Sequence, residues 1–203
     1  MIGLIGAHRV GKSTLAGYIA AKYRFKFIPV SISKMQHKHG FDSSNQSYDF
    51  QTRMEIQEYL LFEFRDLLYT HSTIPQTANM TRDVKPEPIF DRTPLDLIGY
   101  TLIHVTDQLT DEQSAWLLDY IDQCIKLTNE YFTHIMLVQP GIPLVSDNTT
   151  SARASAGIIE HLNAVYLAYM VDPRVKSKTS ILPREILDMD ERANYFKEHL
   201  TNV

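Results

Sequence analysis

Short apolar runs alternate with longer segments of helical spacing along the chain. Residues 1–5 are apolar and short enough to form a buried strand, and residues 13–22 follow with apolar side chains on one side of a helix. The same pattern predicts later strands at 25–30, 88–90, 133–138 and 180–182, and later helices at 50–69, 93–105, 110–129, 158–170 and 188–200. A short helix is also expected inside the polar segment 31–49.

This alternation predicts an α/β fold with about five parallel strands and helices on both faces of the sheet. A chain of 203 residues suits one domain with a sizeable core, and no repeat or linker divides it. We therefore expect a single domain over residues 1–203. Within it, residues 144–157 are small, polar and poorly periodic, which is typical of a mobile lid over an active site, and we expect a small lid over approximately residues 141–157.

A glycine-rich motif joins the first strand to the first helix. Residues 6–13 read GAHRVGKS and match G-x-x-x-x-G-K-[ST], the phosphate-binding loop or P-loop. Gly6 and Gly11 permit a tight loop whose backbone N–H groups surround phosphate oxygens. Lys12 would reach the β- and γ-phosphates, and Ser13 would hold Mg²⁺. The predicted ATP-binding residues are Gly6, His8, Arg9, Val10, Gly11, Lys12, Ser13 and Thr14.

A second candidate group follows the strand at 88–90. Asp91 would end that strand facing the P-loop, where it could hold Mg²⁺ or accept a proton from a substrate hydroxyl, and the sequence leaves both roles open. Arg92 could bind a substrate phosphate or carboxylate through two parallel hydrogen bonds. The alternative for both residues is a strand end before a helix capped by Thr93, with Arg92 in a surface ion pair.

Arg153 is the single Lys or Arg between Lys126 and Arg174. An arginine in a small-residue lid can stabilise the charge on a phosphoryl group during transfer. The predicted catalytic residues are therefore Lys12, Asp91, Arg92 and Arg153, and the predicted metal ligands are Ser13 and Asp91. A solvated loop arginine is the alternative for Arg153.

Charge is distributed unevenly along the chain. The net charge is −4, yet residues 1–41 contain seven Lys and Arg and no Asp or Glu. This asymmetry is expected to concentrate positive potential near the P-loop, where an anionic substrate would arrive. One cysteine, Cys124, excludes an internal disulfide, and no apolar run reaches bilayer length. We therefore expect a cytoplasmic protein without a membrane span or signal peptide.

The P-loop and the Asp91-Arg92-Thr93 triplet resemble the P-loop nucleoside and nucleotide kinases, in which an acid and an arginine after a strand line the acceptor site. The chain is also similar to small bacteriophage proteins described as AAA-type ATPases or nucleotide kinases, over the segments HGFDSSNQSYDFQTRMEIQEYLL, IFDRTPLDLIGYTL and LVQPGIPLV. This resemblance implies ATP and Mg²⁺ as cofactors. For a phage-encoded protein it implies the cytoplasm of the host cell.

Two features depart from the kinase pattern. Deoxynucleoside kinases carry a glutamate base after the second strand, where this chain has Ser31-Ile32-Ser33. The multi-arginine lid of nucleoside monophosphate kinases is reduced here to Arg153. The acceptor therefore cannot be carried over from either group.

The motifs and the resemblance together predict transfer of the γ-phosphate of ATP to a (deoxy)nucleoside or nucleotide. An alternative acceptor is the hydroxymethyl group of 5-hydroxymethyluracil in DNA, which the basic segment 1–41 could contact. A regulatory P-loop NTPase or binding module is a further alternative, although AAA+ ATPases need a second helical domain. The oligomeric state stays open, with a homodimer as one option.

Overall fold

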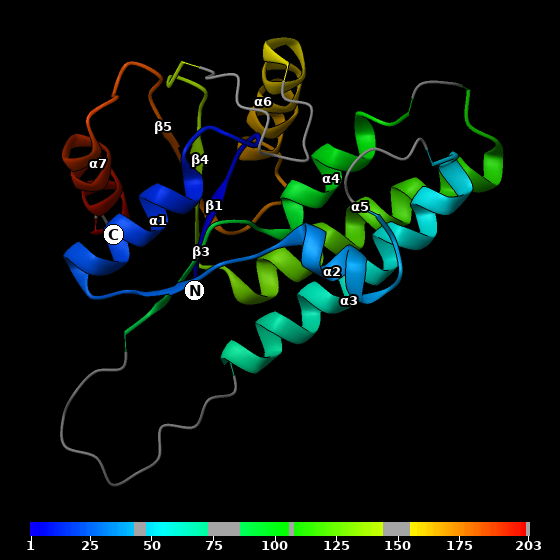
Figure 1. Cartoon of the computed structure of the whole chain (residues 1–203), viewed down its shortest axis with the longest axis horizontal. Helices are drawn as coiled ribbons and strands as arrows, with labels where there is room; N and C mark the ends of the chain where they lie inside the picture. Colours follow the sequence, from blue (N-terminus) through cyan, green and yellow to red (C-terminus); the bar gives the residue numbers. More distant parts are fainter. Residues whose placement is uncertain (43–47, 73–85, 106–107, 144–154, 202–203) are drawn as a thin grey trace, which may run out of the picture.

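A parallel five-stranded sheet forms the centre of the protein, with strand order β2-β3-β1-β4-β5 (Figure 1). The computed structural model describes residues 1–42, 48–72, 86–105, 108–143 and 155–201. The strands are β1 (Ile2–Ile5), β2 (Lys26–Ile28), β3 (Pro88–Phe90), β4 (His134–Val138) and β5 (Lys178–Leu182). The predicted α/β fold with a five-stranded parallel sheet is confirmed.

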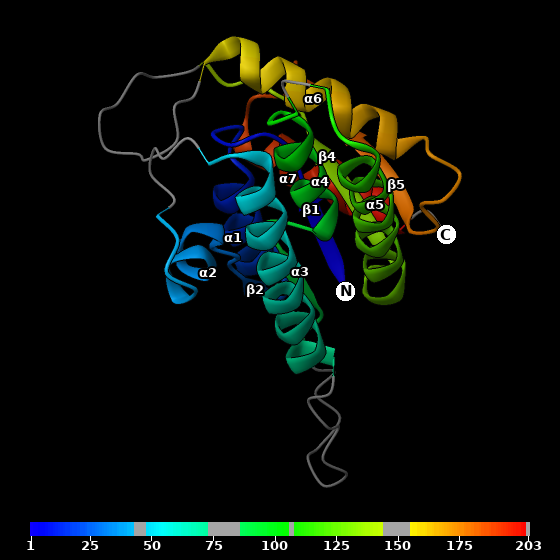
Figure 2. The same cartoon turned by 90° about the vertical axis from the view of Figure 1, so that its right-hand side faces the viewer.

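Helices cover both faces of the sheet. The helix α1 (Lys12–Tyr23) packs beside α7 (Met189–Thr201) on one face. The other face carries α3 (Phe50–Ser72), α4 (Pro94–Leu102), α5 (Asp111–Tyr131) and α6 (Ala156–Met170), as the turned view shows (Figure 2). The short helix α2 (Ile32–Lys38) packs against α3. Since both faces are covered, the inner strands are buried and mainly apolar, and all four residues of β1 and all five of β4 are buried.

Several helix ends differ from the sequence prediction, among them the end of α4 and the start of α6. The helix α4 ends at Leu102 instead of residue 105, because the chain tightens into a turn in which the His104 N–H donates to Thr101 O at 3.1 Å. The helix α6 begins at Ala156, where Ser155 caps it by accepting the Ile158 N–H at 3.2 Å. Residues 156 and 157 of the predicted lid, 141–157, thus belong to α6, and its residues 144–154 lie outside the described structure, so the lid stays a prediction.

The carboxyl ends of all five strands meet at one edge of the sheet, because the strands are parallel. At that edge β1 leads into the P-loop, β2 leads toward Val30, and β3 leads directly into Asp91. Ligands of open α/β sheets bind at such an edge. The sheet thus brings the two candidate groups of the sequence to one place.

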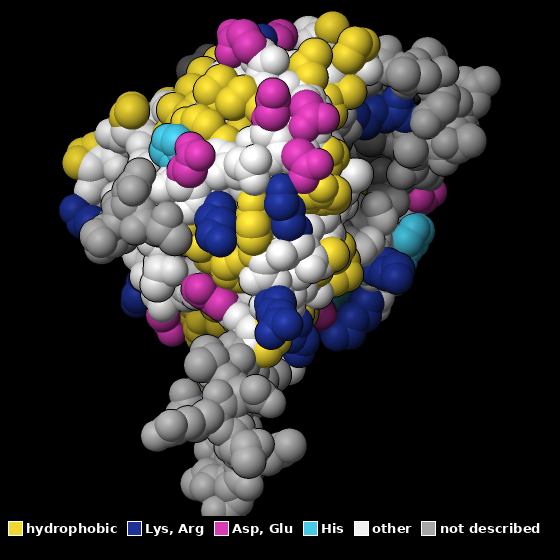
Figure 3. Space-filling view, turned by 90° about the vertical axis from the view of Figure 1, so that its left-hand side faces the viewer, with side chains coloured by type: hydrophobic (Ala, Val, Ile, Leu, Met, Phe, Trp, Pro, Cys, Tyr) yellow, Lys and Arg dark blue, Asp and Glu magenta, His cyan; other side chains and the backbone are white. Residues whose placement is uncertain are grey.

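The basic residues of the N-terminal segment are partly neutralised in the fold. Lys22 pairs with Asp190 at 2.6 Å, and Lys38 pairs with Glu63 at 2.7 Å. On the face that carries α1 and α7, Lys and Arg side chains lie among Asp and Glu side chains (Figure 3). None of the helices in the described part of the chain is both long and apolar enough to cross a bilayer.

Candidate functional site

The P-loop adopts a backbone that depends on its two glycines. Gly6 has a φ of 151°, and a β-carbon at this position would lie 2.5 Å from the carbonyl oxygen of Val138. Gly11 has a φ of 86° and is the N-cap of α1. A side chain at either position would be strained or would collide with its neighbours. The sequence motif therefore forms the tight loop that it predicts.

The first turn of α1 provides an anion-binding end. No side chain caps this helix, and its first turn contains no acidic residue. The leading backbone N–H groups of a helix have no partner within the helix, and the helix dipole makes this end positive. An anion such as a phosphate group is the natural partner for these N–H groups.

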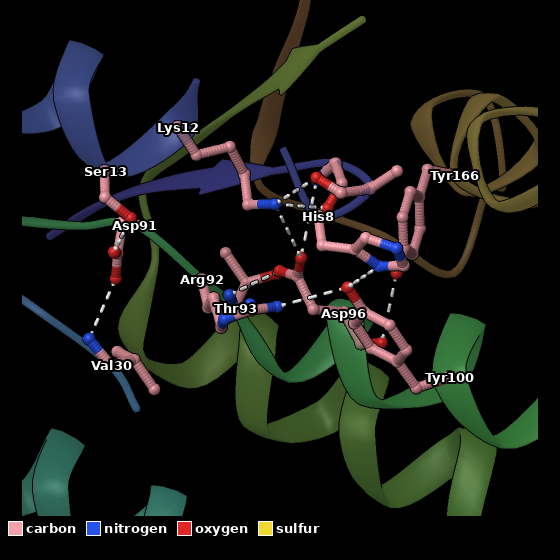
Figure 4. Close-up of polar contacts among 12 residues, drawn as sticks. His8, Lys12, Ser13, Val30, Asp91, Arg92, Thr93, Asp96, Tyr100 and Tyr166 are labelled. Atoms are coloured by element: carbon pink, nitrogen blue, oxygen red, sulfur yellow. Dashed lines mark hydrogen bonds and ion pairs between the residues drawn. The ribbon is translucent and has the colours of Figure 1, made fainter. Parts of the chain in front are cut away.

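Lys12 is buried beneath the loop and donates to the loop's own carbonyl groups (Figure 4). Its Nζ donates to the carbonyl oxygen of Gly6, and to that of Ala7 at 2.7 Å. It also lies 4.0 Å from Asp96 Oδ1. Burial lowers the pKa of Lys12 to about 7, and the charge of Arg92 adds to this effect, while Asp96 and Asp91 oppose it.

Asp91 connects the P-loop to the end of β2. The Ser13 hydroxyl donates to Asp91 Oδ2 at 2.5 Å, and the Val30 N–H donates to Asp91 Oδ1 at 2.8 Å. The carboxylate is buried, whereas Ser13 is exposed at the start of α1. Asp91 is thereby fixed beside the P-loop hydroxyl, as Figure 4 shows. The predicted metal ligands Ser13 and Asp91 do lie together.

Asp96 reaches the P-loop from the first turn of α4. Its Oδ2 accepts the Thr93 N–H at 2.7 Å, as expected for a residue that caps the helix start. Its Oδ1 accepts the N–H of Gly6 at 3.4 Å and faces Lys12. Burial raises the pKa of Asp96, and the charges of Lys12 and Arg92 oppose that rise. One side chain therefore caps α4 and braces the P-loop.

A polar chain runs from Arg92 to the P-loop through Tyr100. Arg92 donates to the Tyr100 hydroxyl at 3.5 Å, and that hydroxyl lies 3.2 Å from Nδ1 of His8. Burial lowers the pKa of His8 to about 4, helped by the charges of Lys12, Arg92 and Arg9, so this imidazole is neutral at physiological pH.

The two ring nitrogens of His8 have different surroundings. The Tyr100 hydroxyl accepts from Arg92 and shares a hydrogen bond with Nδ1, in which either atom can be the donor. The Nε2 atom is buried and has no hydrogen-bond partner in the described part of the chain. One ring nitrogen of His8 is therefore left without a polar neighbour within the described residues.

The structure brings most of the predicted residues together. Lys12, Asp91 and Arg92 meet at the carboxyl edge of the sheet, with His8 beside them. Among the other loop residues, Val10 is buried, Thr14 is exposed, and Arg9 adopts a left-handed φ of 65°. Arg153 lies outside the described residues, so its catalytic role stays a prediction.

Three residues at or beside this site were missed from sequence. Asp96 was assigned only a helix-start role, and Tyr100 offered no signal beyond helical spacing. Arg192 does carry a signal: it lies on the apolar side of α7, beside Ala193 and near Phe196, which are both buried. A charged residue in an apolar stripe requires a polar partner in the fold.

No protein-family model and no curated protein matches the chain. Among solved structures, it is similar to deoxyadenosine kinase from M. mycoides with dCTP bound, at 16% identity, a TM-score of 0.63, and coverage of 100% of this chain and 99% of that chain. The same enzyme with dCMP and dCDP gives 17% identity, a TM-score of 0.61 and the same coverage. The YorR protein from Bacillus subtilis, in complex with phosphorylated GDP, gives 16% identity, a TM-score of 0.50, and coverage of 98% and 94%. The chain therefore shares the fold of these structures over almost its whole length.

Proposed function

We propose that the protein is an ATP-dependent phosphotransferase that moves the γ-phosphate of ATP to a (deoxy)nucleoside or nucleotide. The observation that carries this proposal is the contact between Ser13 and Asp91, whose side-chain oxygens lie 2.5 Å apart at the mouth of the P-loop. A P-loop alone is shared by many NTPases. A P-loop with an acid and an adjacent arginine at its mouth also provides a place for a phosphoryl acceptor.

The donor side of the site is formed by the P-loop and α1. The uncapped N–H groups of α1 and the loop backbone would bind the phosphate oxygens of ATP. Lys12 would exchange its hydrogen bonds with Gly6 and Ala7 for bonds to the β- and γ-phosphates. Asp96 would keep the charged lysine in place during this exchange, since it faces Nζ from beneath the loop.

Ser13 and Asp91 fit a magnesium ion in their chemistry. Both present oxygen atoms, which are the ligands that Mg²⁺ takes, and both lie where the phosphates of ATP would complete the ligand set. Bound there, Mg²⁺ would neutralise the charge that develops on the phosphoryl group. We assign Asp91 to the metal, directly or through water, because its Oδ2 already contacts the P-loop hydroxyl.

The acceptor side is formed by Arg92, Tyr100 and His8. Arg92 has no ion-pair partner among the described residues, and its guanidinium lies against Tyr100, with Cζ 5.6 Å from the ring centroid. It is therefore suited to an anionic or hydroxyl group of an acceptor, beside the neutral imidazole of His8. The deoxynucleotides named with the M. mycoides structures, together with the resemblance to phage proteins, support a deoxynucleoside or its monophosphate in phage nucleotide metabolism.

A phosphate-transfer screen tests the proposal. Labelled ATP and Mg²⁺ would be offered with free deoxynucleosides, their monophosphates, and DNA that contains thymine or 5-hydroxymethyluracil. We expect label in a free nucleoside or nucleotide. Label in modified DNA alone would replace the proposal with the DNA alternative. ATP hydrolysis that no acceptor diverts would instead indicate a regulatory NTPase.

Nucleotide binding is expected to take up a proton at about pH 8. Because the pKa of Lys12 is lowered to about 7, this lysine is uncharged in most free molecules at that pH. Phosphate oxygens favour the charged ammonium and raise its pKa, so a proton must be bound together with the nucleotide. Affinity for ADP should therefore fall as the pH rises above about 7, by up to about tenfold per pH unit.

Calorimetry in two buffers of different ionisation enthalpy measures the number of protons that are taken up when the nucleotide binds. At about pH 8 the nucleotide phosphates have lost their own protons, so a proton taken up at this pH is bound by the protein. The variant Lys12→Met should bind ADP weakly and without proton uptake. A wild-type protein that binds ADP with no proton uptake at this pH would contradict the expected titration of Lys12.

A further inference from the structure

Arg192 is a fully buried arginine that has no charged partner in the part of the chain that the structure describes. Only 1% of its surface is exposed, although it lies in the first turn of α7. Its NH2 donates to the carbonyl oxygen of Val10 at 3.4 Å, while Nε and NH1 have no hydrogen-bond partner among the described residues. No ion pair joins Arg192 to a carboxylate within the described ranges.

Such burial is costly. Arginine is almost never fully buried unless it is paired, because a charge in the protein interior loses its hydration. Burial alone lowers the pKa of Arg192. A single long bond to a backbone carbonyl compensates little of this cost. The protein therefore maintains a positive charge beneath the P-loop that the described part of the chain does not balance.

The guanidinium points at the N-terminus of α1. NH1 lies 3.2 Å from the position that a β-carbon on Gly11 would occupy. Gly11 is the N-cap of α1, and the same turn has neither a side-chain cap nor an acidic residue. Two sets of hydrogen-bond donors from distant segments therefore lie at Gly11. They are the leading N–H groups of α1 and the guanidinium nitrogens of Arg192. Both favour an anion.

We propose that Arg192 binds a phosphate oxygen of the donor nucleotide, a nucleoside di- or triphosphate held at the N-terminus of α1. This inference rests on the proposed function, and it adds a donor ligand from α7 to those of the P-loop. Ile142 packs over the same glycine, with its Cδ1 3.1 Å from the β-carbon position, and its side chain is 40% exposed. This exposed side chain is the group that moves aside when the phosphate reaches the guanidinium.

Two variants separate phosphate binding from a purely structural role. Arg192→Gln keeps a donor for the Val10 carbonyl but removes the charge, whereas Arg192→Lys keeps the charge. Dissociation constants for ADP and for pyrophosphate would be measured by calorimetry, together with the melting temperature without ligand. Arg174→Gln serves as the matched control, because Arg174 is exposed and pairs with Asp122 and Asp172. It precedes β5 and so lies at the amino ends of the strands, away from the P-loop.

We expect Arg192→Gln to weaken both ADP and pyrophosphate binding on the order of 10-fold to 100-fold, as the loss of one charge-assisted hydrogen bond would. Arg192→Lys should recover most of this affinity, and Arg174→Gln should bind like the wild type. The melting temperature of ligand-free Arg192→Gln should not fall, since the variant removes a buried charge.

Three results would overturn the inference. Equal affinity in Arg192→Gln and wild type would show that the guanidinium does not meet the nucleotide. Weakened ADP binding with unchanged pyrophosphate binding would place Arg192 at the nucleoside. The third result is weakened binding together with a lowered melting temperature in Arg192→Gln, neither of which Arg192→Lys restores. It would show that Arg192 only stabilises the P-loop. Each readout is equilibrium binding, so the proposed phosphoryl transfer can fail in the acceptor screen while this inference stands.

Discussion

Replacing Lys12 by methionine is expected to lower phosphoryl transfer by about 10³-fold or more, because it removes the charge that stabilises the γ-phosphate as it leaves ATP. Lys12 reaches the phosphates from beneath the loop, where burial excludes water and strengthens the interaction. Methionine fills the space of the lysine side chain as far as Cε and removes only the ammonium group. Turnover would be measured with saturating ATP and with the acceptor that the screen identifies.

The fold should survive this substitution. Asp96 loses one charged neighbour, yet it keeps the N–H groups of Thr93 and Gly6 and remains near Arg92. The matched control is Lys22→Met on the same helix, where the lysine is outside the site and pairs with Asp190. Full activity of a folded Lys12→Met protein would show that the P-loop does not carry the reaction.

The strands and the P-loop could be predicted because their signals are local. A short apolar run bounded by turn residues favours a buried strand, and the spacing of two glycines followed by a lysine and a serine is a specific signal for a phosphate-binding loop. The start of α4 was equally readable, since Asp96 does accept the Thr93 N–H from three residues before it. These features depend on neighbours in the sequence, which is why periodicity and capping rules identify them.

The contacts that complete the site depend on packing between distant segments. Asp96 bonds to Gly6 across 90 residues, and Arg192 bonds to Val10 across 182 residues. No local rule relates such positions, because the sheet order places β1 between β3 and β4 and so brings their following loops together. The contact between His8 and Tyr100 was missed for the same reason, since these residues lie 92 positions apart.

Asp91 belongs both to the residues predicted from the sequence and to the contacts between distant segments. Its substitution therefore tests how these two parts of the site work together. Asp91→Asn is expected to lower turnover by about 10²-fold to 10³-fold, because the amide cannot neutralise a metal ion as the carboxylate does. The Mg²⁺ concentration needed for half-maximal turnover should rise severalfold, whereas ADP affinity measured without Mg²⁺ should change little. The Val30 N–H can still be accepted by the amide oxygen, so the loop after β2 should keep its place.

The Mg²⁺ dependence decides between the two roles that the sequence left open for Asp91. If the carboxylate holds the metal, the titration curve shifts, and raised Mg²⁺ or Mn²⁺ restores part of the turnover. If it instead accepts the proton of a substrate hydroxyl, turnover falls at every Mg²⁺ concentration and half-saturation does not move. Asp190→Asn is the matched control, because that exposed carboxylate binds only Lys22 and Tyr18 within the described structure. The 2.5 Å contact between Asp91 and the Ser13 hydroxyl leads us to expect the shifted curve.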